Sequence, residues 1–421
     1  MIFGIIGLGD MGGAFAKIYA KAGFKVVASD LPEKFNSLSK EYQPLGVEVV
    51  ENAISVAQSA DILLFCVEAV KIGDVVKSVA ASIRPNTIVG AQTSIKAPEI
   101  AAFEKYLAPN IPIVTVHSLH GPHVDPRGQI LILINHRASD QQAKTALKFY
   151  KHTGSKIEVI GSHQEHDAMM ADIQVVTHIG FESIGTSFMH RGIFPWENPI
   201  HANGLDNLKL ILTLRIYSYK YHVYAGLAIL NPYAERDVRV YAEVENELFG
   251  LMISEDEAAF RAIIQKAKDE IFSEKEGPLM LNDNLMANYS LNPSADHKPN
   301  SHLSLLSMAV TWTRLGSNPY KNLVCQTPPF KLRVGMVEYL FRNEELLEES
   351  IKAAIYDKSI RKDDLAFHTA VQEWAHIVES KDLKAYRKHF EKTKAFLADR
   401  LDAGRTISTL LIERLNKNEK S

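Results

Sequence analysis

Short apolar runs alternate with longer stretches of helical periodicity through roughly the first 160 residues of the chain. The apolar runs, which predict strands, cover residues 2–6, 24–29, 62–67, 87–89, 111–116, 130–134 and 156–160. The helical patterns between them cover residues 11–22, 52–60, 72–83, 98–107 and 140–152. Strands that alternate with helices in this way predict βαβ units, and therefore a Rossmann-like α/β domain built on a doubly wound parallel sheet.

The pattern becomes helical near residue 163 and stays helical to the end of the chain, which predicts an all-α C-terminal domain. Part of it recurs: the spacing Ser-x-Asp-x-x-x-aromatic-Arg that begins at Ser254 begins again at Ser380, 126 residues later. His178 and His302 begin similar helices 124 residues apart. A repeat at this period indicates two duplicated helical units, and chance similarity between amphipathic helices is the alternative.

A chain of 421 residues is too long for one ordinary core. We predict a dinucleotide-binding domain over residues 1–162, a first helical unit over 163–290 and a second helical unit over 291–421. The segment 289–300, rich in Pro, Asn and Ser, is the predicted linker between the two helical units.

The composition argues against several classes of protein. The net charge is −3 with both signs interspersed, so no nucleic-acid partner is expected. Cys66 and Cys325 are the only cysteines and lack the spacing of a metal site, so neither a disulfide framework nor a metal is expected. No apolar run reaches the roughly 20 residues of a membrane span, and no leader precedes the first strand. We therefore expect a soluble, cytoplasmic protein.

The first predicted strand leads directly into G-x-G-x-x-G and then into a helix, which is the setting that makes this motif specific. Gly7 makes the strand-to-helix turn, Gly9 lets a pyrophosphate approach the backbone, and Gly12 lets the helix pack close to the strand. The helix N-terminus then offers N–H groups to the phosphates. The predicted cofactor-binding residues of this turn are Gly7, Leu8, Gly9, Asp10, Met11 and Gly12.

Asp30 follows the second predicted strand, where an acidic residue binds the ribose 2′-hydroxyl of NAD. On this argument alone Asp30 favours NAD, because a carboxylate repels the 2′-phosphate of NADP. Lys34 lies four residues further on and could offset that charge. A turn residue before Pro32 is the alternative for Asp30.

Three histidines, His117, His120 and His123, follow a predicted strand at the edge of the sheet where ligands bind. One interpretation is a metal site, but few carboxylates or thiols lie nearby in the sequence apart from Asp125, which argues against it. A general base fits better, because oxidising an alcohol requires that the hydroxyl proton be accepted as hydride leaves. Ser94, after the preceding predicted strand, is expected to hydrogen-bond this base. A surface histidine in a loop is the remaining alternative.

The helical half carries further candidates. The segment 165–167 (Glu-His-Asp) opens a helix, and Asp167 and His178 are expected to share one helical face because eleven residues make three turns. For His166, a helix-capping role and a catalytic role are both open. Arg215, Lys331 and Arg333 are candidate carboxylate-binding cations, and ordinary surface cations are the alternative.

At this point the chain resembles the prephenate dehydrogenase family, and in particular its longer fungal, NADP-dependent branch. The resemblance covers nearly the whole chain. Residues 92–96 (QTSIK) look like the family's Ser-Val-Lys segment, and residues 115–122 (TVHSLHGP) look like its His-Pro-Met-Phe-Gly-Pro segment. Residues 165–167 with His178 match its Glu-His-Asp helix, and residues 214–218 (LRIYS) resemble the fungal branch.

The resemblance implies oxidative decarboxylation of prephenate to 4-hydroxyphenylpyruvate, with hydride transfer to NADP, in tyrosine biosynthesis. It implies that His117 accepts the hydroxyl proton, Ser94 orients His117 and the hydroxyl, and His178 lines the substrate pocket. The substrate-binding cations it allows are Arg215, Lys331, Arg333 and Lys96. Bacterial relatives pair through their helical domains, so a chain with two such units is expected to be structurally sufficient as a monomer, with a homodimer as the alternative.

Other functions remain open at this point. An arogenate dehydrogenase differs by one amine on the substrate, and no single residue decides between the two. A β-hydroxyacid dehydrogenase would be expected to show Asp-x-Pro-Val-Ser-Gly-Gly and a lysine in Gly-x-x-x-x-Gly-Lys, and neither is present. A non-catalytic dinucleotide sensor would not need His117, Ser94 and His178 together.

Overall fold

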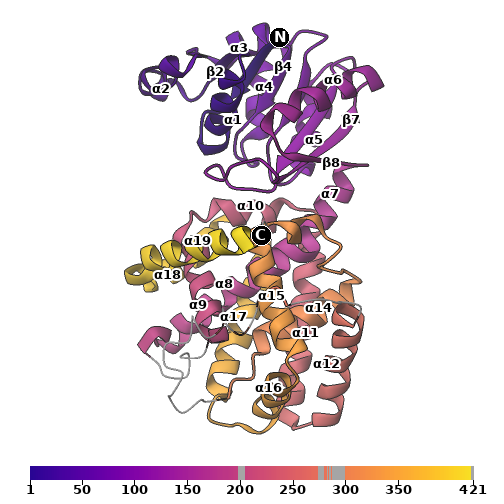
Figure 1. Cartoon of the computed structure of the whole chain (residues 1–421), viewed down its shortest axis with the longest axis vertical. Helices are drawn as coiled ribbons and strands as arrows, with labels where there is room; N and C mark the ends of the chain where they lie inside the picture. The colour runs from indigo at the N-terminus through magenta and orange to yellow at the C-terminus, as the bar shows by residue number, and fades with distance from the viewer. Residues whose placement is uncertain (198–203, 274–278, 282, 284–285, 287–298, 419–421) are drawn as a thin grey trace. The chain divides into compact units, whose positions relative to one another are not determined.

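The computed structural model describes residues 1–197, 204–273, 279–281, 283, 286 and 299–418. The chain divides into two compact units, Met1–Ala168 and Met169–Ser421 (Figure 1). This division falls inside helix α7 (His163–Met169), whereas the predicted domain boundary precedes that helix. The predicted boundary at residue 290 and most of the predicted linker lie outside the described residues.

The first unit is built on one eight-stranded sheet in the order β3-β2-β1-β4-β5-β6-β7-β8. The strands are β1 (Ile2–Ile6), β2 (Lys25–Ser29), β3 (Val47–Val49), β4 (Ile62–Phe65), β5 (Ile88–Ala91), β6 (Ile113–Ser118), β7 (Ile130–Arg137) and β8 (Lys156–Ile160). Strands β1 to β6 are parallel, as predicted, but β7 pairs antiparallel with β6. A loop without a helix joins β6 to β7, and such a loop is enough for an antiparallel pair. The edge strand β3 has only three residues, too few to show a periodicity.

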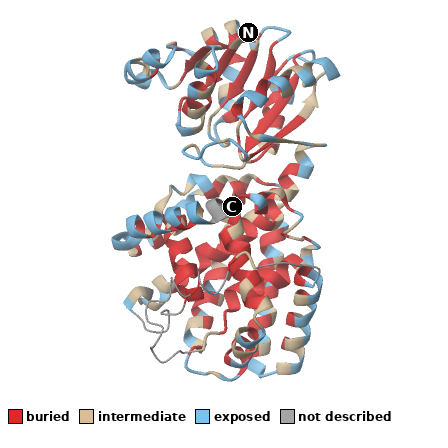
Figure 2. Cartoon of the chain, in the orientation of Figure 1, coloured by how far each residue is buried: buried red, intermediate tan, exposed pale blue. Residues whose placement is uncertain are grey.

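Helices cover both faces of this sheet, so its central strands are buried on both sides (Figure 2). On one face, Phe15 and Tyr19 of α1 (Asp10–Lys21) pack with Phe149 of α6 (Asp140–Tyr150). On the other face lie Val76 and Phe103. The helices of that face are α3 (Ala53–Ser59), α4 (Ile72–Val79) and α5 (Ala97–Tyr106), and α2 (Phe35–Tyr42) follows β2.

The described residues of the second unit form helices joined by turns and loops, and none of them forms a strand. A π-helical segment, Met170–Val175, leads into the first long helix. The α-helices are α8 (Val176–Arg191), α9 (Gly204–Ser218), α10 (His222–Leu230), α11 (Ala234–Ser254), α12 (Glu257–Phe272), α14 (Leu303–Leu315), α15 (Pro328–Arg342), α16 (Glu344–Tyr356), α17 (Arg361–Glu379), α18 (Leu383–Phe396) and α19 (Leu401–Asn418).

These helices occur as two copies in the same order, so that α8–α12 correspond to α14–α18. Helices α8 and α14 both end at a left-handed glycine, Gly192 (φ 61°) and Gly316 (φ 65°), 124 residues apart. Glu255 (φ 56°) and Lys381 (φ 52°) are both left-handed, although neither is glycine. Each is followed by an aspartate that caps the next helix through its side chain. The matching backbone conformations at these helix ends are those that a duplication of the helical half would produce.

The two copies interlock. Helix α8 of the first copy packs against α17 of the second, and α14 of the second packs against α11 of the first. In the same way, α18 of the second copy packs against α8 of the first, and α12 of the first packs against α14 of the second. Helix α11 of the first copy also packs against α17 of the second (Figure 1). Each copy therefore completes the core of the other, which is the arrangement expected of a twofold dimer joined into one chain.

Candidate functional site

The glycine turn has the geometry that dinucleotide binding requires. Gly7 adopts φ +102°, and a Cβ at this position would lie 2.4 Å from the carbonyl oxygen of Cys66. A Cβ on Gly12 would lie 1.9 Å from the carbonyl oxygen of Gly7. Packing thus demands glycine at both positions, whereas a Cβ on Gly9 would meet no atom within 4 Å. The helix that begins at Asp10 has no side-chain cap, so its first N–H groups and the open backbone at Gly9 fit a pyrophosphate.

Asp30 is held by the protein itself. Its Oδ2 accepts a hydrogen bond from the N–H of Leu8 at 2.7 Å, and its Oδ1 lies 2.9 Å from Nζ of Lys34. Burial alone would raise the pKa of Asp30, but the N–H groups of Leu31 and Leu8 and the Lys34 ammonium hold it below its ordinary value. The N–H of Leu8, one of the predicted cofactor-binding residues, is therefore already bonded to Asp30. Lys34 offsets the charge of Asp30, as the sequence allowed.

A chain of hydrogen bonds runs from His117 into the domain. His117, near the end of β6, has its Nδ1 2.8 Å from Nε2 of His166. Nδ1 of His166 lies 2.7 Å from Oδ1 of Asp167. Both carboxylate oxygens of Asp167 also accept backbone N–H groups at the start of α5, from Lys96 at 2.8 Å and from Ala97 at 2.7 Å. Residues distant in sequence thus form one buried relay, His117–His166–Asp167.

The relay fixes the tautomers of both histidines. A carboxylate can only accept, so Nδ1 of His166 carries the proton that Asp167 receives. Nε2 of His166 is then an acceptor, and Nδ1 of His117 must donate to it. This leaves Nε2 of His117 as the free base, with its ring orientation set by the rest of the chain.

The electrostatics keep His117 neutral. Burial lowers its pKa well below the usual value of 6.5, and the neighbouring His166 and Lys96 lower it further. Burial likewise lowers the pKa of His166, with Lys96 and His163 adding to the effect. A neutral imidazole at the carboxyl end of a parallel strand is suited to accept a proton from a substrate hydroxyl.

The structure contradicts the expectation that Lys96 binds substrate. Its side chain is fully buried, and Nζ donates to the carbonyl oxygen of Val116 at 2.7 Å and to Oε1 of Glu99 at 3.1 Å. Thr93 and Thr115 donate to the Glu99 carboxylate. Lys96 is therefore an internal cation that joins the loop after β5 to strand β6.

Ser94 and the other two loop histidines lie near the same edge of the sheet. Ser94 is half-buried, and among the described hydrogen bonds none joins it to His117, whose ring bonds His166 instead. Among the described residues, His166 is therefore the side chain that orients the ring of His117. His120 bonds the carbonyl of Gly121, and His123 is exposed. Among the described residues, no group of His, Cys, Asp or Glu is arranged to hold a metal ion.

In the second unit, Arg333 on α15 is a buried cation without a carboxylate partner among the described residues. Its guanidinium lies 3.2 Å from Nδ1 of His178 and 4.5 Å from the ring centroid of Phe330, and its buried Nε has no hydrogen-bond partner. Burial lowers the pKa of Arg333 to about 10, so it stays protonated near neutrality. Burial raises the pKa of nearby Glu182 to about 8, and burial with Arg333 lowers the pKa of His178 and keeps it neutral. An uncompensated buried cation is costly unless an anion binds it.

The other two candidate cations differ from Arg333. Arg215 donates to the hydroxyls of Ser408 and Thr409 on α19, and its positive charge acts on Arg333. Lys331 is only half-buried. Arg333 is thus the cation whose surroundings best fit a carboxylate ligand.

Asp167 and His178 do not follow the three-turn spacing expected of them. The π-helical segment Met170–Val175 lies between them and shifts the helical phase. Asp167 bonds groups of the first unit, whereas His178 bonds Arg333 of the second. For His166 both a capping and a catalytic role were open from the sequence, and its bonds to His117 and Asp167 come from long-range contacts. The position of Glu182 near Arg333 likewise depends on contacts that no local pattern predicts.

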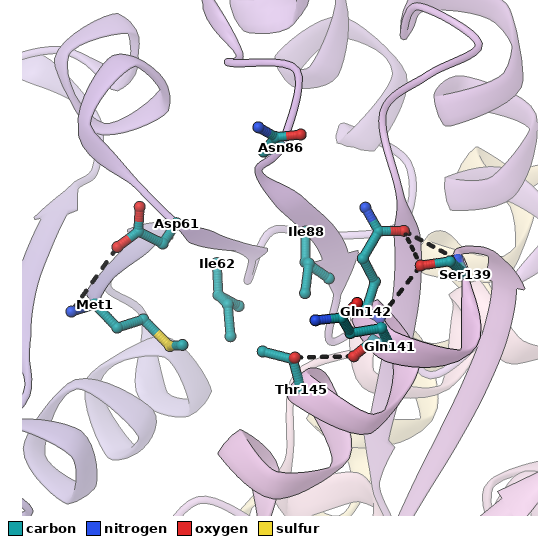
Figure 3. A pocket seen from close by; sticks show the side chains of 9 residues that line it. All are labelled: Met1, Asp61, Ile62, Asn86, Ile88, Ser139, Gln141, Gln142 and Thr145. Atoms are coloured by element: carbon teal, nitrogen blue, oxygen red, sulfur yellow. Dashed lines mark hydrogen bonds and ion pairs between the residues drawn. The ribbon is translucent and has the colours of Figure 1, made fainter.

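A hollow lined by Asp61, Asn86 and Ser139 lies elsewhere in the first unit (Figure 3). Its lining residues come from the amino ends of β4 and β5 and from the start of α6. Ligands of open α/β sheets bind at the opposite, carboxyl ends of the strands. This hollow is therefore separate from the glycine turn and from the relay. Among the described residues, no helix has the length and apolarity needed to cross a membrane.

The glycine turn and the histidine relay together define a two-domain oxidoreductase of the nicotinamide-dinucleotide class. Family models agree with this class. Residues 175–417 match a C-terminal domain of the 6-phosphogluconate dehydrogenase type, and residues 2–91 match the coenzyme F420-dependent NADP oxidoreductase domain.

Known proteins narrow the class to one family. The chain is 40% identical to prephenate dehydrogenase [NADP(+)] of Saccharomyces cerevisiae, over 98% of this chain and 94% of the relative. It is 38% identical to a probable prephenate dehydrogenase [NADP(+)] of Schizosaccharomyces pombe, over 99% and 97%. The crystal structure of Aquifex aeolicus prephenate dehydrogenase with hydroxyphenyl propionate and NAD+ shares the fold, with TM-score 0.53, 17% identity, and 64% of this chain and 96% of that one covered. The chain belongs to the prephenate dehydrogenase family.

Proposed function

We propose that this protein oxidises and decarboxylates prephenate to 4-hydroxyphenylpyruvate, with NADP as the hydride acceptor, in tyrosine biosynthesis. The observation that carries the proposal is the buried relay His117–His166–Asp167 in a domain with a dinucleotide-binding glycine turn. The two fungal relatives, similar over nearly the whole chain, are named for this substrate and this cofactor.

The residues support a simple sequence of steps. Nε2 of His117 accepts the proton of the C4 hydroxyl, and the relay to His166 and Asp167 stabilises the imidazolium that forms. NADP, which the glycine turn at Gly7, Gly9 and Gly12 would hold, would supply the acceptor for the hydride that leaves C4. The bond from the ring to its carboxylate then breaks, carbon dioxide leaves, and its electron pair makes the ring aromatic. His117 returns its proton to the oxygen that becomes the phenol. Aromatisation favours the products, so the protein mainly supplies position and charge.

The direct test is turnover of prephenate and of arogenate by the full chain, with NADP and with NAD, measured as reduced cofactor and as carbon dioxide. We expect the combination of prephenate and NADP to have the highest kcat/KM. Preferred turnover of arogenate would make the protein an arogenate dehydrogenase, and no turnover of either substrate would refute the proposal.

We also propose that the enzyme acts in the cytoplasm. We propose further that a single chain is structurally sufficient as a monomer, because the interlocked copies complete each other's core.

We assign Arg333 to a substrate carboxylate, which gives a first prediction. Arg333→Met should lower kcat/KM for prephenate roughly 10- to 150-fold, mainly through KM, because a charge-assisted contact contributes about 1.5–3 kcal/mol. The melting temperature should not fall, since the variant removes a buried cation that has no carboxylate partner among the described residues.

Arg215→Met is the matched control, because Arg215 is the neighbouring cation on α9 and bonds hydroxyl groups instead. Its effect on the KM for prephenate should be the smaller of the two. If Arg215→Met raises KM more than Arg333→Met does, the carboxylate site belongs to Arg215.

A second prediction concerns the choice of cofactor. Lys34 is half exposed and neutralises Asp30, so Lys34→Ala should restore the repulsion between Asp30 and a 2′-phosphate. We expect kcat/KM for NADP to fall about tenfold, as one charge-assisted contact is lost, and kcat/KM for NAD to stay nearly constant. Steady-state kinetics with both cofactors measure the ratio, with Lys40→Ala on α2 as the control. An unchanged ratio would remove Lys34 from cofactor recognition.

A further inference from the structure

The pair His178–Arg333 has a counterpart in the other copy of the helical repeat. His302 lies 124 residues after His178, and Lys209 lies 124 residues before Arg333. Nδ1 of His302 is 3.0 Å from Nζ of Lys209, as Nδ1 of His178 is 3.2 Å from the guanidinium of Arg333. All four residues are buried. The helical unit therefore holds two histidine–cation pairs at corresponding positions of its two copies.

The two pairs differ at the position three residues before the cation, about one helical turn earlier in the same helix. Asp206 lies beside Lys209, with Oδ1 2.6 Å from Nζ and 3.7 Å from Nδ1 of His302. The position that corresponds to Asp206 is Phe330, whose ring lies beneath Arg333 at 4.5 Å. Lys209 thus has a carboxylate from its own helix, whereas Arg333 has an aromatic face.

The surroundings of the two pairs also differ, because polar groups lie near Arg333 whereas their counterparts in the other copy are apolar. Near Arg333, the hydroxyls of Tyr386 and Tyr217 donate to the carboxylate and to the backbone carbonyl of Glu182. The corresponding positions of the other copy hold only apolar side chains. These are Phe260, Phe341 and Leu306, all buried. Glu182, Tyr217 and Tyr386 thus supply polar groups near Arg333, and their three counterparts in the other copy are apolar.

We propose that the repeat contains two related cation sites, and that Asp206 closes one of them by occupying it with the chain's own carboxylate. Phe330 leaves the other site open to the carboxylate of a ligand. The residue at the position shared by Asp206 and Phe330 therefore decides which site binds substrate. The identity of that ligand rests on the proposed function, whereas the closing of the Lys209 site does not.

The first test transfers the carboxylate to the open site. Phe330→Asp places an acid three residues before Arg333, as Asp206 stands before Lys209. We expect the KM for prephenate to rise at least about tenfold above that of the control Phe330→Asn, with little difference in the KM for NADP, because an internal ion pair competes with the ligand. Equal KM values in the two variants would overturn the proposal.

The second test reopens the closed site and uses no substrate. Asp206→Ala leaves Lys209 without its carboxylate, and formate is small enough to replace it. We expect formate to raise the melting temperature of Asp206→Ala more than chloride does at equal concentration, and more than formate raises that of the wild type. The double variant Asp206→Ala/Lys209→Met should be more stable than Asp206→Ala alone. If formate and chloride act alike and the double variant gains nothing, Asp206 does not serve as the internal anion, even if prephenate is turned over normally.

Discussion

Replacing His117 by asparagine should lower kcat for prephenate by roughly 10²–10⁴-fold, because the reaction loses its general base. The amide keeps a polar group of similar size at the end of β6, so the fold and the KM should change little. His117 is the end of the relay whose Nε2 is free to accept a proton, and no other described histidine forms such a chain. Steady-state kinetics with both substrates saturating measure the effect.

Two readouts separate this role from a structural one. The control His123→Asn changes an exposed histidine in the loop that follows β6 and should leave kcat unaltered. In the wild type, the acid limb of the kcat/KM profile should have its midpoint below pH 6.5, because burial and neighbouring positive charge lower the pKa of His117. Activity is then complete above that pKa and is lost as the pH falls through it. Near-normal turnover in His117→Asn would remove this residue from the mechanism.

Lys96→Met should lower the free energy of unfolding by about 3–5 kcal/mol, the usual cost of breaking a buried ion pair on one side. The substitution leaves the fully buried Glu99 without its cation and the carbonyl oxygen of Val116 without its donor. Urea denaturation followed by the fluorescence and circular dichroism of the full chain measures the loss.

The double variant Lys96→Met/Glu99→Gln provides the control. It removes both charges, so it should be more stable than Lys96→Met alone. If Lys96→Met keeps wild-type stability and instead raises the KM for prephenate, then Lys96 binds substrate after all.

The geometry of the glycine turn and the position of His117 at the end of a strand could be predicted because their signals are local. Gly7, Gly9 and Gly12 are fixed by the turn from β1 to α1, and His117 by its place at the end of a strand. Asp30 was harder to interpret, since the groups that bond it include the N–H of Leu8, 22 residues away, as well as its neighbours Leu31 and Lys34. The sequence pattern places an acid there but does not say whether that acid is already bonded.

His166 and Lys96 show why the rest of the site could not be predicted. His166 becomes part of the relay only because α7 brings it to β6, 49 residues away in sequence. Lys96 follows a strand at the ligand edge, as a substrate-binding lysine would, yet its side chain turns inward to Glu99. Whether a charged side chain faces solvent or the interior depends on the partners that the fold brings near it, and these are not neighbours in the chain.

Most strands and helices of the first unit, the dinucleotide turn and the helical character of the second half could be predicted from the sequence alone. Periodicity and glycine placement follow from backbone sterics within a few residues, so they can be read without the fold. Long-range contacts in the folded chain distinguish Arg333, which has no carboxylate partner among the described residues, from Arg215, and the pair His178–Arg333 from the pair His302–Lys209. A cation is available to a ligand only where the folded chain has not already neutralised it, and Asp206 neutralises Lys209.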